Sequence, residues 1–348
     1  MVLINSEISA RINPMSQSQF VSKCTTDALA IAAQSLISGH LVAFPTETVY
    51  GLGANATDKS AVAKIYAAKA RPTDHPLIVH IHSMQALGDW AEDIAAYAIA
   101  LARDFWPGPM TLVLKRSPLA QDFITGGQDS VAMRVPDHVV ALALLEAFSA
   151  IGGKGVVAPS ANRFGHVSPT TAQAVSDELS SYLSPEDQIL DGGPCTVGVE
   201  STIIDCTGVV PKILRPGAIT AEMITASTGL DVVTSEGSHG ANSSTNSAQE
   251  NIRVSGSLEA HYAPAAKVLL DQNPHAGQGF IAVATTATPD GVIRLASPTN
   301  DVEFAQSLYA SLRKADELGL SHVVIEQPQG VGIAIAIRDR LMRAANGR

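Results

Sequence analysis

The chain has 348 residues, of which 46% are hydrophobic and only 16% are charged. This balance excludes a mainly disordered chain, which would combine low hydrophobicity with high charge. The formal net charge of −10 argues against a dedicated nucleic-acid binder that relies on many phosphate contacts. At about 150 residues per domain, the length predicts two domains.

The cysteine content predicts a reducing compartment. Three cysteines, Cys24, Cys195 and Cys206, fit neither a disulfide scaffold nor a zinc pattern. The start of the chain lacks the basic residues and apolar run of a signal peptide. No apolar run approaches the roughly 18 residues that a membrane span needs. We therefore expect a cytoplasmic protein.

Helical and strand patterns follow one another through the first part of the chain. Residues 1–22 are polar and are expected to form a loose N-terminal extension. Helices are predicted over residues 26–36, 58–70, 83–88, 92–104, 138–150 and 170–180. Strands are predicted over residues 41–44, 76–81, 110–115, 131–135 and 156–159, near residue 189, and over 202–205 and 212–215. Because the strands first alternate with helices and then bunch together, we expect a mixed α/β sheet.

The composition changes near Ala226. Residues 235–257 are rich in serine, threonine and glycine, which is typical of a linker. We place the first domain at residues 23–224, the linker at 225–264 and a small α/β domain at 265–348. In that last domain, strands are predicted over residues 267–271, 280–285 and 322–326, and helices over 302–318 and 332–345.

Familiar phosphate and metal motifs are weak. Residues 152–155 lack the spacing of a Walker A loop. Residues 51–56 resemble a dinucleotide fingerprint, but the segment before them is too long for its tight turn. Residues 44–53 place hydroxyls and a carboxylate between a buried strand and a predicted glycine turn, which fits a ligand or a self-satisfied turn. His80 and His82 share a strand face, but without a third ligand they predict no zinc site.

Several polar side chains stand at the ends of predicted elements. Lys69 and Arg71, at a helix end, either favour the helix dipole or clamp an anion. Arg134 lies on an apolar strand and needs a partner, which is a protein carboxylate or a ligand carboxylate. Ser160 and Asn162 follow a buried strand, where they either cap a turn or face a ligand at the edge of the sheet.

Eight short motifs, taken in order over residues 28–220, resemble the YrdC family, the threonylcarbamoyl-AMP synthases. They are PTETVYGLG from Pro45, KARP from Lys69, PLIVH from Pro76, WPGPMT from Trp106, RVP from Arg134, APSAN from Ala158, STI from Ser201 and LRPG from Leu214. The HYAP sequence at His261, followed by a small α/β domain, resembles the long two-domain form of this family.

The resemblance implies both a fold and an activity. The fold is a twisted mixed α/β sheet with a positively charged cavity, then a linker and a small Rossmann-like domain. The activity is ATP-dependent synthesis of L-threonylcarbamoyladenylate from L-threonine and bicarbonate, with release of pyrophosphate. The product serves the threonylcarbamoyl modification of adenosine 37 in tRNA, through a downstream tRNA threonylcarbamoyl transferase. Mg²⁺ is expected to enter with ATP and to take no protein side chain as ligand. Neither a membrane nor stable nucleic-acid binding is expected.

The resemblance also implies residue roles. The catalytic residues would be Lys69 and Arg71. The L-threonine site would include Thr46, His80, Arg134 and Ser201. The ATP site would include Lys69, Thr73, Ser130, Ser160, Asn162, Ser168, Arg215 and Tyr262. The last of these lies in the linker and would close over the site.

Three other readings compete with the synthase. The first is an RNA-binding module, which the acidic total and the lack of Lys/Arg runs disfavour. The second is a regulatory paralogue without synthase activity, although both the KxR and the SxN elements are intact. The third is a carbamoyl-transfer domain of the hydrogenase-maturation type, which usually sits in a much longer chain.

Overall fold

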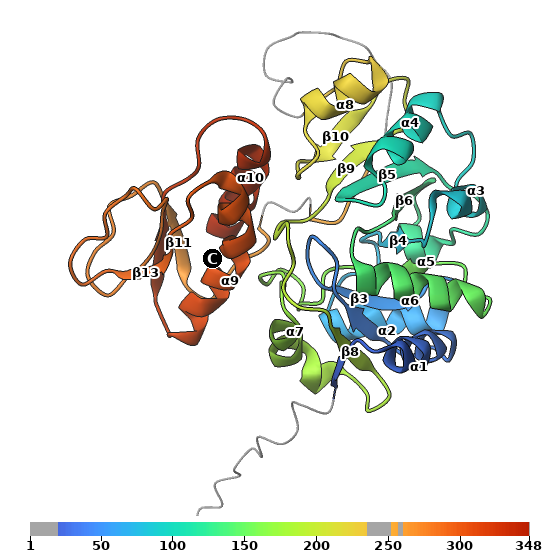
Figure 1. Cartoon of the computed structure of the whole chain (residues 1–348), viewed down its shortest axis with the longest axis horizontal. Helices are drawn as coiled ribbons and strands as arrows, with labels where there is room; N and C mark the ends of the chain where they lie inside the picture. The colour runs from blue at the N-terminus through green and yellow to red at the C-terminus, as the bar shows by residue number, and fades with distance from the viewer. Residues whose placement is uncertain (1–19, 235–251, 257–259, 348) are drawn as a thin grey trace, which may run out of the picture.

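The computed structural model describes residues 20–234, 252–256 and 260–347. The predicted N-terminal extension up to residue 19 and most of the predicted serine-rich linker lie outside these described residues. Two α/β domains lie side by side, each with its own sheet (Figure 1). The helices of the C-terminal domain face the N-terminal domain.

The N-terminal domain is built on one ten-stranded sheet with the strand order β1-β8-β2-β3-β7-β4-β6-β5-β9-β10. Its strands are β1 (Val21–Lys23), β2 (Val42–Phe44), β3 (Gly51–Asn55), β4 (Ile78–His80), β5 (Met110–Lys115), β6 (Ser130–Arg134), β7 (Val156–Val157), β8 (Gln188–Asp191), β9 (Thr202–Asp205) and β10 (Lys212–Arg215). The sheet contains both parallel pairs, such as β4 with β6, and antiparallel pairs, such as β5 with β6. The predicted mixed α/β sheet is therefore confirmed.

Helices cover both faces of this sheet. They are α1 (Thr26–Ile37), α2 (Lys59–Lys69), α3 (Leu87–Trp90), α4 (Ala96–Phe105), α5 (Asp122–Thr125), α6 (Val139–Ala150), α7 (Ala172–Leu179) and α8 (Ala221–Thr228), with short 3-10 turns η2 (Met84–Ala86) and η3 (Ser180–Tyr182). Along β2, Val42 and Phe44 pack with α1 and α6, whereas Ala43 packs into the core that includes α2 and α7. This alternation is what a two-residue side-chain period requires of a strand buried on both faces.

The glycine turn predicted at residues 51–53 is wrong, because these residues open strand β3. β3 pairs antiparallel with β2 and with β7. A Cβ atom at Gly53 would lie 2.9 Å from both the Phe44 ring and the Val42 carbonyl oxygen. Glycine therefore stands here because a neighbouring ring fills the side-chain position, and a strand packed in this way has no apolar pattern of its own.

The domain edges differ in detail from the predicted ones. Strand β1 includes Val21 and Ser22, which the sequence assigns to the extension. The predicted boundary after residue 224 falls inside helix α8. Neither element carries a long apolar run, so their order comes from pairing with β8 in the first case and from packing against α4 in the second.

The C-terminal domain has a four-stranded parallel sheet with the order β11-β14-β12-β13. Its elements are β11 (Lys267–Leu270), β12 (Gly279–Ile281), β13 (Ile293–Ala296), α9 (Asp301–Glu317), β14 (His322–Ile325) and α10 (Ile333–Ala345). The expected small Rossmann-like domain is confirmed, although the sequence did not predict β13. One apolar cluster crosses to the N-terminal domain, where Val49 and Val199 pack with Phe304 and Leu308 of α9.

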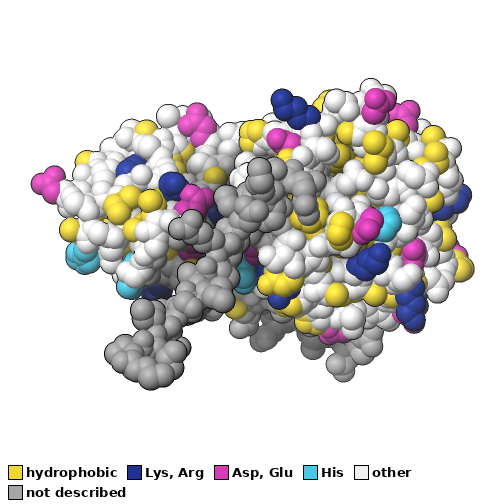
Figure 2. All heavy atoms as spheres, turned by 90° about the horizontal axis from the view of Figure 1, so that it is seen from below, with side chains coloured by type: hydrophobic (Ala, Val, Ile, Leu, Met, Phe, Trp, Pro, Cys, Tyr) yellow, Lys and Arg dark blue, Asp and Glu magenta, His cyan; other side chains and the backbone are white. Residues whose placement is uncertain are grey.

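The surface is mixed in charge. On the face shown in Figure 2, basic and acidic side chains are scattered among apolar and neutral ones. Across the described ranges, no helix combines the length and the apolar character that a membrane crossing demands.

The start of helix α2 yields a stability prediction. The Asp58 carboxylate accepts hydrogen bonds from the Ser60 hydroxyl and from the backbone N–H groups of Ser60 and Ala61, and these bonds lower its pKa below the usual value. We expect Asp58→Ala to lower the free energy of unfolding by about 1 kcal/mol in urea titrations at pH 7. Because the folded-state pKa is lowered, this contribution should vanish as the pH falls through it. Asp58→Asn, which keeps a capping oxygen, should lose much less, and an equal loss would contradict the capping role.

Candidate active site

A small cavity lies on the N-terminal sheet beneath the linker. It is bounded by residues from β4, β6 and the loops that follow β2, α2, β7 and β8, and it is covered by Ser255, Gly256, His261 and Tyr262. Its free volume is about 40 Å³. A water molecule needs about 10–15 Å³, so the space admits a few waters but no nucleotide. The linker therefore closes the site in this structure.

Ten of the thirteen site residues predicted from the sequence line this one cavity. They are Thr46, Lys69, Arg71, His80, Arg134, Ser160, Asn162, Ser201, Arg215 and Tyr262. Thr73, Ser130 and Ser168 do not line it. Thr73 is exposed on the loop after α2, and Ser130 lies in a neighbouring hollow with Gln128 and Arg253. Ser168 is fully buried, one residue behind the wall, where its hydroxyl donates to Glu200.

The end of helix α2 directs two cations into the cavity. Ala70 adopts a left-handed conformation with φ of 49°, so the chain turns sharply between Lys69 and Arg71. The Lys69 ammonium donates to the carbonyl oxygens of Ser160 and Asn162, each at 2.5 Å. The SxN segment after β7 thus holds the lysine through its backbone. The two elements that the sequence analysis singled out are parts of one structure.

Arg71 and Arg215 complete a cluster of buried cations. Arg71 donates to the Pro76 carbonyl oxygen at 2.9 Å, and its Nε has no hydrogen-bond partner. Arg215 donates to the carbonyl oxygens of Ser201 and Ser255. Within the described part of the chain, neither arginine nor Lys69 forms an ion pair with a carboxylate, although all three are buried.

Burial without a counter-charge has an electrostatic consequence. Burial and the neighbouring Arg71 charge hold the pKa of Lys69 well below its ordinary value. Burial also lowers the pKa of Arg71 to about 10. Desolvated cations whose acceptors are all neutral oxygens are costly to the folded chain. An anionic ligand would supply the missing counter-charge, which makes this part of the cavity a candidate anion site.

The partner of Arg134 is a protein carboxylate. Its Nη2 lies 2.7 Å from Oε1 of Glu47, and the pair is almost fully buried. The same guanidinium donates to the Thr48 hydroxyl at 2.9 Å and to the Gly108 carbonyl oxygen. Glu47 was not among the predicted site residues. The sequence feature that could have identified Glu47 is its position between a buried strand and the glycines of β3, where a carboxylate needs a cation.

The other three residues of the predicted threonine site are neutral. His80 and Arg134 are paired in register on β4 and β6, which brings them to the same edge of the sheet. Burial and the Arg134 charge lower the pKa of His80 to about 3, so its ring is uncharged at neutral pH. The Thr46 hydroxyl donates to the Val49 carbonyl oxygen at 2.7 Å. The Ser201 hydroxyl lies 2.8 Å from that of Thr111.

The cover of the cavity depends on close packing between linker residues. A Cβ atom on Gly256 would lie 2.2 Å from the Tyr262 hydroxyl oxygen, and the glycine itself has a φ of +81°. Tyr262 also has a positive φ, of 62°, and its ring stacks on Tyr309 of the C-terminal domain. His261 is buried, and burial lowers its pKa to about 3. The linker thus adds mostly neutral groups to the anion site.

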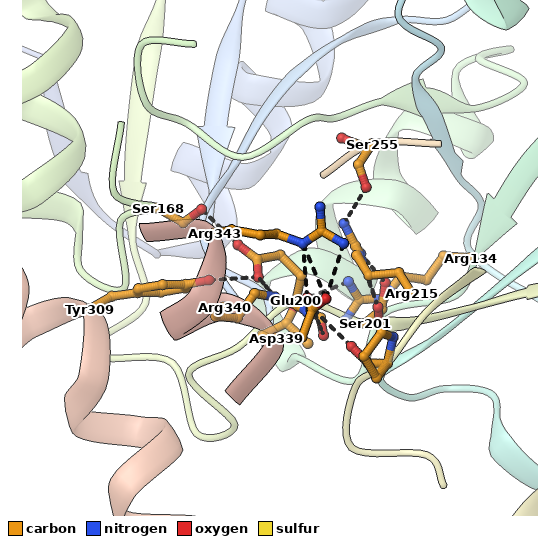
Figure 3. A network of polar contacts seen from close by, with 12 residues as sticks. Arg134, Ser168, Glu200, Ser201, Arg215, Ser255, Tyr309, Asp339, Arg340 and Arg343 are labelled. Atoms are coloured by element: carbon orange, nitrogen blue, oxygen red, sulfur yellow. Dashed lines mark hydrogen bonds and ion pairs between the residues drawn. The ribbon is translucent and has the colours of Figure 1, made fainter. Parts of the chain in front are cut away.

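Glu200 is the one acidic residue that lines the cavity within the described ranges. Its carboxylate accepts hydrogen bonds from Ser168, from Tyr309 of α9 and from Arg340 of α10, as Figure 3 shows. Sequence reasoning did not find this residue. Glu200 precedes the STI motif directly, but its partners Tyr309 and Arg340 lie more than 100 residues further along the chain.

Comparison with known proteins places the chain in a family. The family model described as "Telomere recombination", which covers Sua5, YciO and YrdC proteins, matches residues 34–217. The model described as "Threonylcarbamoyl-AMP synthase, C-terminal domain" matches residues 219–346. The chain therefore belongs to the threonylcarbamoyl-AMP synthase family, in its two-domain form.

Relatives in distant organisms match over most of their length. The threonylcarbamoyl-AMP synthase of Pyrococcus abyssi is 38% identical over 92% of this chain and 94% of its own. That of Bacillus subtilis is 39% identical over 92% of this chain and 93% of its own. The crystal structure of P. abyssi Sua5 complexed with L-threonine superposes with a TM-score of 0.81 at 36% identity, covering 94% of this chain and 97% of that one.

The Glu47–Arg134 pair can be tested by stability measurements. Arg134→Met should leave a buried carboxylate without a partner and lower the free energy of unfolding by about 3–5 kcal/mol. The double variant Glu47→Gln/Arg134→Met removes both charges and should recover a large part of that loss in urea titrations. If the two substitutions are simply additive, the two side chains do not act as a pair.

Proposed function

We propose that the cavity binds ATP and L-threonine and that the protein forms L-threonylcarbamoyladenylate there, with release of pyrophosphate. The observation that carries this proposal is the convergence of Lys69, Arg71 and Arg215, all buried and all without a carboxylate partner in the described part of the chain. ATP and the departing pyrophosphate are polyanions that match such a cluster. Membership of the synthase family supports the same assignment.

The three cations would act on the phosphates. Arginine presents a planar fork that suits phosphate oxygens, whereas lysine offers a compact point charge. Lys69 and Arg71 would neutralise the charge that develops on the leaving pyrophosphate, and Arg215 would help to hold the nucleotide. Ser160 and Asn162 support this arrangement, because their carbonyl oxygens fix the position of the lysine ammonium. Donors fixed in place before the reaction stabilise developing charge most effectively.

L-threonine would bind beside Thr46, His80, Arg134 and Ser201, all of which line the cavity. The relative from P. abyssi was crystallised with this amino acid. Arg134 already pairs with Glu47, so the threonine carboxylate would share a guanidinium whose position is fixed by its protein partners. The neutral His80 ring can accept or donate a hydrogen bond without adding charge.

The reaction needs positioning more than covalent help from the protein. The amine of threonine attacks CO₂ derived from bicarbonate and forms a carbamate, losing a proton. A carbamate oxygen then attacks the α-phosphorus of ATP, the bond to the bridging oxygen breaks, and pyrophosphate leaves with that electron pair. Holding two reactants in line turns a bimolecular step into an effectively unimolecular one. Charge neutralisation by the cation cluster lowers the barrier further.

Mg²⁺ would enter with the nucleotide. The only acidic side chain lining the described cavity, Glu200, already accepts bonds from Ser168, Tyr309 and Arg340, so it has little capacity left for a metal. Magnesium favours phosphate oxygens and its own water molecules. The ion would therefore be carried by the ATP phosphates, where it supplies additional neutralisation of charge.

The linker would open for substrates and close for chemistry. The free volume of about 40 Å³ is too small for ATP, so Ser255, Gly256 and Tyr262 must withdraw before binding. Closure would exclude water from the carbamate and the mixed anhydride, both of which hydrolyse easily. We propose that the product passes to a tRNA threonylcarbamoyl transferase in the cytoplasm.

The proposed reaction is tested by pyrophosphate release from ATP, with L-threonine and bicarbonate each omitted in turn. Release that requires both substrates, together with a product of the mass of threonylcarbamoyladenylate, is the expected result. ATP turnover that ignores threonine would reject the assignment, and binding or regulation without synthesis would then become the leading function.

The cation cluster makes a second prediction within this assay. Lys69→Ala and Arg71→Ala should each lower kcat/KM for ATP by at least about tenfold, because each removes a fixed donor to the phosphates. Lys59→Ala, at an exposed position of the same helix, serves as the matched control and should remain close to wild type. Circular dichroism checks that the variants fold. Full activity in either cavity variant would remove that residue from the anion site.

A further inference from the structure

An ion pair between the two domains stands directly behind the anion site. Arg340, on helix α10 of the C-terminal domain, places its Nε 2.8 Å from Oε2 of Glu200 in the N-terminal domain. Its Nη2 donates at 2.9 Å to the carbonyl oxygen of Pro216, the residue that follows Arg215 in the chain. The Arg340 side chain has no exposed surface, although it carries a full charge. Figure 3 shows Glu200 between Arg340 and Arg215.

The carboxylate of Glu200 accepts its hydrogen bonds from groups other than Arg215. Oε1 accepts from the Ser168 hydroxyl at 2.7 Å, and Oε2 accepts from the Tyr309 hydroxyl at 2.8 Å as well as from Arg340. Arg215 bonds instead to the backbone oxygen of Ser201, the residue that follows Glu200. Two cations thus flank one carboxylate, and only the cation from the C-terminal domain is joined to it by a hydrogen bond.

The Glu200 carboxylate nevertheless interacts electrostatically with both Arg340 and Arg215. Burial alone would raise the pKa of Glu200, but the charges of Arg340 and Arg215 outweigh it and hold the pKa at about 2. Glu200 is therefore ionised at every working pH. An ionised carboxylate on the wall of a phosphate site would repel the nucleotide and attract the nearest free guanidinium, unless another cation neutralises it.

We propose that Arg340 is a positioning residue for the reaction, which neutralises Glu200 and so leaves the Arg215 guanidinium available to the phosphates of ATP. This inference rests on the proposed ATP site. It gives the C-terminal domain a direct electrostatic part in that site, although none of its residues from β11 to α10 lines the cavity. The domain supplies the cation that balances the one acidic residue of the described cavity wall.

A second contact ties the same arginine to the cover of the site. The Arg340 guanidinium carbon lies 5.5 Å from the centroid of the Tyr262 ring, within the range of a cation–π interaction. Another neighbour of this ring is Tyr309, whose hydroxyl donates to Glu200. In its closed position Tyr262 therefore contacts Arg340 directly and Glu200 through Tyr309. Both the charge balance and the closure thus depend on the Glu200–Arg340 pair.

The alternative is that the pair only fastens the two domains together. A purely mechanical role of the pair and a role in charge balance predict opposite results for a double substitution. Arg340→Met removes the cation and leaves Glu200 free to capture Arg215. Glu200→Gln/Arg340→Met removes the carboxylate as well, which frees Arg215 again but restores none of the lost ion pair between the domains.

The experiment measures ATP binding to the full-length protein by calorimetry, without threonine, and the KM for ATP in the pyrophosphate-release assay. Arg340→Met should weaken ATP binding at least tenfold relative to wild type, and by clearly more than Glu200→Gln does. The double variant should return to within about threefold of Glu200→Gln. Arg338→Met is the matched control, since Arg338 lies on the same helix and bonds to Pro328 and Gly330 within the C-terminal domain.

The outcomes separate this inference from the proposed function. A double variant that binds ATP as weakly as Arg340→Met would overturn the charge balance and leave a mechanical role. Wild-type protein that binds no ATP would instead reject the ATP site itself and, with it, the inference. If Arg340→Met does not fold, Arg340→Gln, which keeps a hydrogen-bond donor without the charge, takes its place in the same comparison.

Discussion

The structure depends on a cluster of buried cations that the described chain does not neutralise. Lys69, Arg71 and Arg215 are held by neutral carbonyl and hydroxyl oxygens, so their charges stay available to a ligand. A soluble protein rarely buries a lysine without a carboxylate partner, because the desolvation of the charge is not repaid. The surrounding features follow from this constraint. The left-handed Ala70 aims two cations inward, and the carbonyls after β7 fix the lysine.

The residues proposed to bind threonine and those proposed to bind phosphate differ in their charge balance. Among the residues proposed to bind threonine, Arg134 is paired with Glu47 and His80 is neutral, so this group is nearly balanced in charge. The cations proposed to bind phosphate have no carboxylate partner in the described part of the chain, and Glu200, the one acidic residue of the described cavity wall, pairs with Arg340 of the other domain. The linker closes over both. Binding of a polyanion, closure of the linker and the position of the C-terminal domain are therefore coupled through a short chain of contacts.

The sequence was a good guide wherever local pattern decides structure. Apolar runs placed β5, β9 and β10 with their observed ends, and capping residues placed α1 and α2. It failed at β3, where glycines replace apolar side chains because Phe44 fills their space. In the site, the motifs found ten of the lining residues. They could not reveal the Glu200–Arg340 pair, whose members lie 140 residues apart and meet only after the two domains have folded and docked.

The central claim is that the unpaired cations form an anion site, and thermal unfolding of the wild-type protein with inorganic pyrophosphate tests it most directly. A ligand that binds only the folded state raises its stability in proportion to the logarithm of the ligand concentration. The account predicts a midpoint that rises steadily with pyrophosphate, and a much smaller rise in the Lys69→Ala and Arg71→Ala variants. A midpoint that does not respond to pyrophosphate, or that responds equally in all three proteins, would contradict it.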